Sequence, residues 1–266
     1  TFQEPFGVVG VITPANYPLL LLANYVAPAI AAGNAVVAKP SPEASRSALC
    51  LADLANDAGF PPGLINIVPG YSEAAQALVS HPGVMKIAFT GGTQTGRKIM
   101  ETAASYNKPL ILELGGKSAM VICEDADLDS AVVTAYNAMF LNSGQLCTAA
   151  SRLLVHKNVY EEVIGKLIKY AEENVKLNKL NNIKVIQGDV KKVIPKLAKQ
   201  GIRFDRIVMP RPQLKETFLS HAFKIVRKQG IINYYGFGKQ ENEIINEIEK
   251  DSKKAKKKIK ILKVKK

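Results

Sequence analysis

Two short segments of the sequence place a carboxylate and a thiol where carbonyl chemistry needs them. Glu113 lies in the run 112–118 (LELGGKS), and Cys147 lies in the run 144–148 (GQLCT) of a chain with only three cysteines. A thiol nucleophile and a carboxylate that activates water are the minimum set for oxidising or hydrolysing a carbonyl through a covalent intermediate. The alternative, in which Cys147 is a buried core cysteine, stays open at this point.

The position of Glu113 indicates the functional edge of a sheet. It follows the apolar residues 110–112 and precedes a Gly-Gly turn, which predicts the carboxyl end of a parallel strand, where α/β proteins bind ligands. Half-sheltered there, its carboxyl would have a raised pKa and act as a base near neutral pH. The alternative is a solvated surface carboxylate.

A second candidate site is the run 89–96 (FTGGTQTG), which reads as a strand, a glycine turn and a helix start. The glycines allow close backbone approach, and the helix amides can bind a phosphate. Lys39 and Ser41 follow another strand and add a cation and a hydroxyl suited to a ribose or phosphate. Each feature has an ordinary alternative, since most glycine turns are only turns and most lysines at strand ends are only solvated.

Apolar strands and helices alternate over residues 1–160, which predicts a parallel sheet covered on both faces. We expect strands at 7–13, 34–38, 65–68, 86–89, 109–114, 119–123 and 152–156. We expect helices at 17–32, 46–58, 73–80, 95–105, 128–141 and from about 159 onward. Gly33 and Gly59 are expected to stop the first two helices.

The composition changes near residue 165 and becomes rich in Lys, Asn and Ile. Strands are expected at 183–186, 206–209, 231–236 and 259–264, and helices at 170–178, 217–228 and 241–258. The fold class predicted for the whole chain is α/β: a parallel Rossmann-like sheet flanked by helices, followed by a second α/β segment.

The net charge of +13 is concentrated in the second part. Residues 1–160 carry 9 basic and 11 acidic residues, whereas residues 161–266 carry 27 and 12. The basic part could contact RNA, although the lysines at 253–258 also suit a solvated helix face.

No apolar stretch suits a membrane span, since 19–32 is broken by Asn24 and Pro28. Three cysteines without CxxC spacing and three scattered histidines predict a reduced cytoplasmic protein with no metal site.

Residues 1 to about 165 resemble the aldehyde dehydrogenase superfamily. The matching stretches, in family order, are 5–18 (PFGVVGVITPANYP), 32–34 (AGN) with 39–41 (KPS), 61–63 (PPG), 89–91 (FTG), 112–118 and 144–148. The resemblance implies that Cys147 attacks an aldehyde to give a thiohemiacetal, which passes hydride to NAD(P)+ and leaves a thioester. It implies that Glu113 activates the hydrolytic water, and that Asn16 holds the oxyanion with the Cys147 backbone amide.

The same resemblance implies a cofactor site. Its residues would be Ile12, Thr13, Pro14, Lys39, Ser41, Glu43, Gly70, Phe89, Thr90, Gly91, Gly92, Thr93, Gly96, Leu114 and Gly115. Pro42 stands where the family often has an acidic residue, so the choice between NAD and NADP stays open. The resemblance stops before the family's nicotinamide-ribose glutamate and oligomerising strand, which leaves full activity, the particular aldehyde and an oligomer open.

Residues from about 167 resemble class I S-adenosylmethionine (SAM)-dependent methyltransferases, in particular tRNA guanine N1-methyltransferases. The matching stretches are 170–179 (YAEENVKLNK), 185–190 (VIQGDV), 204–210 (FDRIVMP) and 230–235 (GIINYY). The resemblance implies that Asp189 lies near the cofactor adenine and that the loop 209–212 lines the target base; the alternative for Asp189 is a turn residue. Dehydrogenase-like sequence stands where the family's glycine-rich motif belongs, so we expect no methyl transfer.

These observations predict a chimera of two parts, 1–165 and 166–266. The main hypothesis is a fragment of an NAD(P)-dependent aldehyde dehydrogenase acting on a small aldehyde. One alternative is a tRNA methyltransferase-like, RNA-binding protein, and another is an inactive chimera that retains nucleotide binding.

Overall fold

The structure is a computed structural model that describes residues 3–209, 217–234 and 241–262. The chain divides into two compact units, Thr1–Tyr170 and Ala171–Lys266. Each unit is an α/β structure, so the predicted fold class is confirmed.

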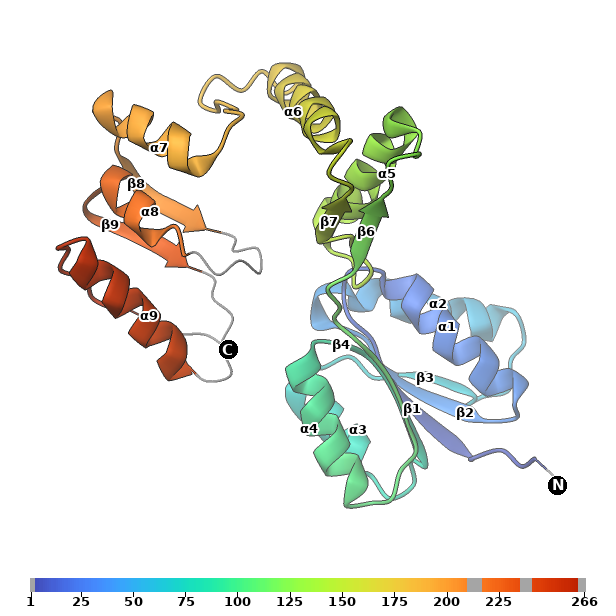
Figure 1. The fold of residues 1–266 in the computed structure, drawn as a ribbon. Coiled ribbons are helices and arrows are strands. Elements are labelled where there is room, and N and C mark those ends of the chain that lie inside the picture. The colour runs from blue at the N-terminus through green and yellow to red at the C-terminus, as the bar shows by residue number, and fades with distance from the viewer. Residues whose placement is uncertain (1–2, 210–216, 235–240, 263–266) are drawn as a thin grey trace. The chain divides into compact units, whose positions relative to one another are not determined.

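A five-stranded parallel sheet forms the centre of the first unit (Figure 1). Its strands are β1 (Val8–Ile12), β2 (Ala35–Lys39), β3 (Ile65–Ile67), β4 (Lys86–Gly91) and β5 (Leu110–Leu114), in the spatial order β3-β2-β1-β4-β5. All four pairings are parallel, as the Val- and Ile-rich runs between helices predict. Strands β2 and β3 therefore lie on one side of β1, and β4 and β5 lie on the other.

Helices cover both faces of this sheet. On one face α1 (Pro18–Ala31) and α2 (Ser45–Asp57) pack over a core that includes Val11, Leu22 and Val36. On the other face α3 (Ser72–Ser80) and α4 (Thr93–Ala104) pack over a core that includes Ile87 and Ile99. A short 3-10 turn, η1 (Pro42–Ala44), precedes α2. Side chains alternate between the two faces along each strand, so every second residue of a strand faces α1 and α2, and the residues between them face α3 and α4.

A smaller parallel pair completes the first unit. Strands β6 (Ala119–Ile122) and β7 (Arg152–Val155) pack one face on α5 (Leu128–Phe140) and α6 (Tyr160–Leu177). Ile122, Val132 and Val163 form the buried centre of this packing. The 3-10 turn η2 (Leu141–Gly144) leads from α5 toward β7.

The second unit holds α7 (Val190–Lys199), β8 (Phe204–Met209), α8 (Leu219–Ile225), β9 (Val226–Tyr234) and α9 (Glu241–Lys254), with β8 and β9 paired in parallel. The strand expected at 183–186 is wrong, since these residues pair with no described strand. The strand expected at 259–264 is wrong over 259–262, and its last residues lie outside the described ones.

Two helices of this unit differ from expectation. The helix expected at 217–228 is confined to α8, because residues from Val226 onward pair with β8. Helix α7 was not predicted. Its apolar residues Val190, Val193, Ile194 and Leu197 follow helical spacing, but Pro195 inside the helix obscured that pattern.

Candidate active site

The thiol of Cys147 lies on a tightly bent loop between α5 and β7. Asn142, Ser143 and Gly144 have φ angles of 50°, 57° and 73°, three successive residues in the left-handed region. Only glycine adopts this region without cost, so Asn142 and Ser143 hold backbone strain of the kind found at functional sites. Cys147 is exposed and forms no disulfide, so the alternative of a buried core cysteine is wrong.

Asn16 fastens the loop after β1 to the loop of the thiol. Its side-chain Nδ2 donates a hydrogen bond to the backbone oxygen of Gln145 at 2.8 Å. In return, Nδ2 of Asn142 donates to the backbone oxygen of Asn16 at 3.0 Å. The Asn16 amide, predicted to hold an oxyanion, is thereby bound to Gln145, two residues before Cys147 in the sequence. The second N–H of this amide takes part in neither bond.

The Gly-Gly turn after β5 also touches the thiol loop. A Cβ atom built on Gly116 would lie 3.1 Å from the backbone oxygen of Cys147, so the two backbones are in close approach. Nε of Arg152 donates to the backbone oxygen of Lys117 at 2.9 Å and anchors the end of this turn. Glu113, three residues before Gly116, is exposed on the edge strand β5, so the half-sheltered position expected for it is wrong.

Tyr25 in the mostly apolar helix α1 was not among the predicted site residues. Its hydroxyl lies 2.6 Å from Oγ1 of Thr90, and Thr90 is the register partner of Glu113 across β4 and β5. Burial raises the pKa of Tyr25; the hydrogen bond with Thr90 opposes this rise, and the negative charge of Glu113 adds to it. No spacing rule connects Tyr25 with Thr90, so only the tertiary structure reveals the pair.

The glycine turn between β4 and α4 leaves a helix N-terminus open. Gly92 precedes α4 and no side chain caps the helix there, so its first amides are available to an anion. A Cβ on Gly92 would meet nothing within 4 Å, whereas one on Gly91 would lie 2.4 Å from the Phe89 ring. A Cβ on Gly96 would lie 2.5 Å from Leu114. Two of these glycines are therefore required by packing, and the third lines open space.

The other predicted cofactor residues lie along the same carboxyl edge of the sheet. Ile12 ends β1, and Thr13 and Pro14 follow it at the point where the strand order reverses, beside β4. Thr13 is 3% exposed, and its Oγ1 has no hydrogen-bond partner among the described residues. Gly70 lies two residues before α3, where a Cβ would be 2.7 Å from Ala74.

Lys39 is a buried cation at the end of β2. It is 7% exposed, and burial lowers its pKa, while the charge of Glu43 opposes that shift. The hydroxyl of Ser41 donates to the Glu43 carboxylate, so the acid one position beyond Pro42 is held next to Lys39 and Ser41. A cation, a hydroxyl and a carboxylate together suit a phosphorylated ribose or its free hydroxyls.

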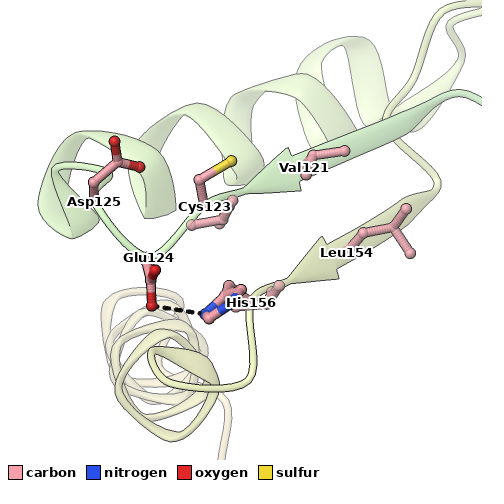
Figure 2. Close-up of a pocket in the computed structure, with 8 residues that line it drawn as sticks. Val121, Cys123, Glu124, Asp125, Leu154 and His156 are labelled. Carbon is pink, nitrogen blue, oxygen red and sulfur yellow. Dashed lines mark ion pairs between the residues drawn. The ribbon is translucent and has the colours of Figure 1, made fainter.

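A separate concavity of about 470 Å³ lies at the carboxyl ends of β6 and β7 (Figure 2). Glu124 is turned toward His156, with Oε2 3.4 Å from Nδ1, while the sulfur of Cys123 points away from the imidazole. Asn158 donates to the same Glu124 oxygen at 2.8 Å. Over residues 3–209, 217–234 and 241–262, no three His, Cys, Asp or Glu side chains form a group able to hold a metal ion.

In the second unit Asp189 has a local structural role. Its carboxylate accepts a hydrogen bond from the backbone N–H of Lys191 at 2.8 Å and so caps α7. Met209 ends β8, and the rest of the predicted base-lining loop, 210–212, lies outside the described residues. Within the described part of the chain, no helix is long and apolar enough to cross a membrane.

Comparison with known proteins finds two families in this chain. The aldehyde dehydrogenase family matches residues 1–188, and the TRM5/TYW2 methyltransferase domain matches residues 120–262. An aminoaldehyde dehydrogenase from Arabidopsis thaliana is 49% identical over 66% of this chain and 35% of its own length. Retinaldehyde dehydrogenase 3 from Mus musculus is 49% identical over 65% of this chain and 34% of its own length.

A similar fold is found in solved structures. The crystal structure of PnpE in complex with nicotinamide adenine dinucleotide is 46% identical, with a TM-score of 0.62, over 63% of this chain and 35% of that one. The chain thus spans about a third of the length of the relatives it matches.

Proposed function

The chain belongs to the aldehyde dehydrogenase family through residues 1–188 and to the TRM5/TYW2 methyltransferase domain family through residues 120–262, and we propose that its first unit oxidises an aldehyde with NAD(P)+. The product is a carboxylic acid, formed through a covalent intermediate on Cys147. The observation that carries this proposal is the junction of three segments: the Asn16 loop, the Gly116 turn and the strained loop before Cys147.

Cys147 acts as the nucleophile. Its exposed thiolate attacks the aldehyde carbon, and the carbonyl oxygen becomes the oxyanion of a thiohemiacetal. The second N–H of the Asn16 amide and the Cys147 backbone N–H stabilise that oxyanion. The bond from Asn16 to Gln145 supports this role, because a donor that is already oriented costs no reorganisation during the reaction.

Glu113 acts as the general base in the second half-reaction. Its carboxylate takes a proton from the water that attacks the thioester, which releases the acid and restores the thiol. Its place near the carboxyl end of β5, three residues before the turn that contacts the Cys147 backbone, supports this assignment.

The carboxyl edge of the sheet fits a dinucleotide. The uncapped start of α4 would receive the pyrophosphate, and Lys39, Ser41 and Glu43 would hold the adenosine ribose or its phosphate. The buried Thr13 hydroxyl, which has no partner among the described residues, supports a polar ligand beside β1 and β4. When bound, the nicotinamide supplies the hydride acceptor. The choice between NAD and NADP depends on whether Glu43 repels a ribose phosphate.

The test is NAD(P)H formation from a panel of small aldehydes, with alkylation by iodoacetamide followed by mass spectrometry. Cys147→Ala should abolish turnover, while Cys50→Ala, which removes another exposed thiol in α2, should leave it unchanged. Asn16→Ala should lower the rate by about 10²–10³, the usual effect of losing one oxyanion donor. Turnover that persists in Cys147→Ala would refute the covalent mechanism.

A second candidate function is RNA binding by the basic part, proposed as residues 166–266. It is favoured by the methyltransferase-domain match and by the excess of basic residues after 160. Aldehyde dehydrogenase sequence, which matches residues 1–188, stands where the methyltransferase family has its glycine-rich SAM-binding motif. We therefore derive no methyl transfer. Retention of tRNA that weakens steeply with salt, without turnover, would support this candidate. Cofactor that protects Cys147 from alkylation, with neither activity, would indicate nucleotide binding alone.

A further inference from the structure

The side chains of Tyr25, Thr90 and Glu113 belong to the same face of the large sheet, the face covered by α1. Along β4, Phe89 packs in the core under α3 and α4, so its neighbour Thr90 faces α1. Along β5, Leu112 and Leu114 pack in that same core, so Glu113 between them also faces α1. Thr90 and Glu113 are register partners on adjacent parallel strands, which lie about 4.8 Å apart.

Helix α1 brings the third group to this face. Tyr25 is partly buried against the core under α1, and its hydroxyl lies 2.6 Å from Oγ1 of Thr90. Thr90 itself is only 6% exposed, so this contact is shielded from water that would otherwise compete for it. Burial raises the pKa of the Tyr25 phenol, and the negative charge of Glu113 adds a smaller rise.

We propose that Tyr25 is a positioning residue for Glu113, acting through the hydroxyl of Thr90. The phenol donates its proton to Oγ1 of Thr90, and the Thr90 hydroxyl is then directed toward the carboxylate on the next strand. A threonine hydroxyl has one proton to donate and two lone pairs to accept with, so a donor from Tyr25 leaves that proton free for Glu113. This assignment rests on the proposed role of Glu113 as the base.

Either hydroxyl can donate in this bond on geometry alone, and the burial of Tyr25 keeps its phenol protonated and able to donate. Burial and the nearby carboxylate both raise the pKa of the phenol, whereas the bond with Thr90 lowers it. Tyr25 therefore keeps its proton at neutral pH and remains a donor. Exposed on an edge strand, Glu113 has few other groups to fix its orientation, so the Thr90 hydroxyl is well placed to do so.

The first test needs no turnover. Phenol ionisation is followed by ultraviolet difference absorbance in the wild type and in Glu113→Gln, with Tyr25→Phe to identify the signal of Tyr25. We expect the Tyr25 titration to move to lower pH in Glu113→Gln, because a negative charge that raises it is removed. As a control, the same comparison is made for Tyr160, an exposed phenol of α6, whose signal is identified with Tyr160→Phe. Glu113→Gln should leave the Tyr160 signal unmoved. An unmoved Tyr25 titration would overturn the proposal.

The second test separates the two half-reactions with a p-nitrophenyl ester. Tyr25→Phe should leave the burst of acylation on Cys147 unchanged and slow the later hydrolysis by about two- to tenfold, the usual range for losing one neutral hydrogen bond. Thr90→Ser keeps a hydroxyl and should retain most of the rate, whereas Thr90→Val should match Tyr25→Phe. Equal loss of burst and hydrolysis would overturn the positioning role. Ester hydrolysis that persists in Cys147→Ala would refute the proposed covalent function, while the titration would still decide whether Tyr25 and Glu113 are coupled.

Discussion

Gly10 in the central strand β1 provides a sharp test of how the sheet is packed beneath the site. A Cβ atom at this position would lie 2.8 Å from Cδ1 of Ile87, 3.0 Å from Cγ1 of Val84 and 3.1 Å from Cγ of Leu78. All three neighbours are buried in the core under α3 and α4. Gly10→Ala therefore inserts a methyl group that these three side chains must shift to accommodate.

The expected size of the effect follows from two opposing contributions. Overpacking a well-filled core costs about 1–3 kcal/mol. Replacing glycine in a strand recovers about 0.5–1 kcal/mol, because the unfolded chain loses conformational freedom. The difference between the middles of these two ranges is about 1 kcal/mol, and we expect Gly10→Ala to lower the free energy of unfolding of the first unit by about this amount.

A matched control makes the same chemical change without the clash. Gly165 lies in α6, where a Cβ would meet nothing within 4 Å. Gly165→Ala should raise the free energy of unfolding by about 0.5–1 kcal/mol through helix propensity. The same substitution should thus lower the free energy of unfolding at Gly10 and raise it at Gly165.

The assay is urea unfolding followed by far-UV circular dichroism, with hydrogen exchange of the β1 amides to assign the transition. In the double variant Gly10→Ala with Ile87→Val, the contacting Cδ1 is removed, so the combined loss should be smaller than the sum of the single losses. The reasoning is refuted if Gly10→Ala is as stable as Gly165→Ala, or if the two losses at Gly10 and Ile87 simply add.

Three further predictions concern the core, a helix start and the buried cation. Leu22→Ala should destabilise the first unit by about 2–5 kcal/mol because Leu22 is fully buried, while Leu20→Ala, at a position 57% exposed, should stay within about 0.5 kcal/mol in urea unfolding. Asp127 caps α5, and hydrogen bonds, foremost from the Ser130 hydroxyl, lower its pKa below the usual 3.8. Its stabilisation is therefore present above about pH 4 and is lost as the pH falls through the folded pKa, so acid unfolding curves of Asp127→Asn should lack that loss. Burial lowers the pKa of Lys39, so NAD(P)+ affinity, measured by fluorescence titration, should begin to fall at a lower pH than it would with a lysine of ordinary pKa. In Lys39→Arg the affinity should not change over the same pH range, because arginine keeps its charge.

The sequence predicted the first unit well because its signals are local. Apolar strands, glycine and proline stops and helical spacing act over ten to twenty residues, and each expected strand of residues 1–160 corresponds to an observed one within a few positions. The glycine turn was likewise placed between β4 and α4, where the structure has it.

The second unit was predicted less well, for a physical reason. A strand is stable only when it pairs, and pairing depends on residues distant in sequence. The apolar run at 183–186 looks like a strand but has no described partner. Residues 226–228 look helical and instead form the start of β9, where Val226 pairs with Phe204 of β8.

Short motifs are enough to predict the residue types of the site: a thiol at 147, a carboxylate at 113 and an amide at 16. The contacts between these motifs depend on how the whole unit folds. The bond between Asn16 and Gln145 joins residues 129 positions apart, and that between Tyr25 and Thr90 joins residues 65 apart. Such pairs depend on strand register and on which helix face meets the sheet, and these are fixed by the packing of the whole unit rather than by any local pattern.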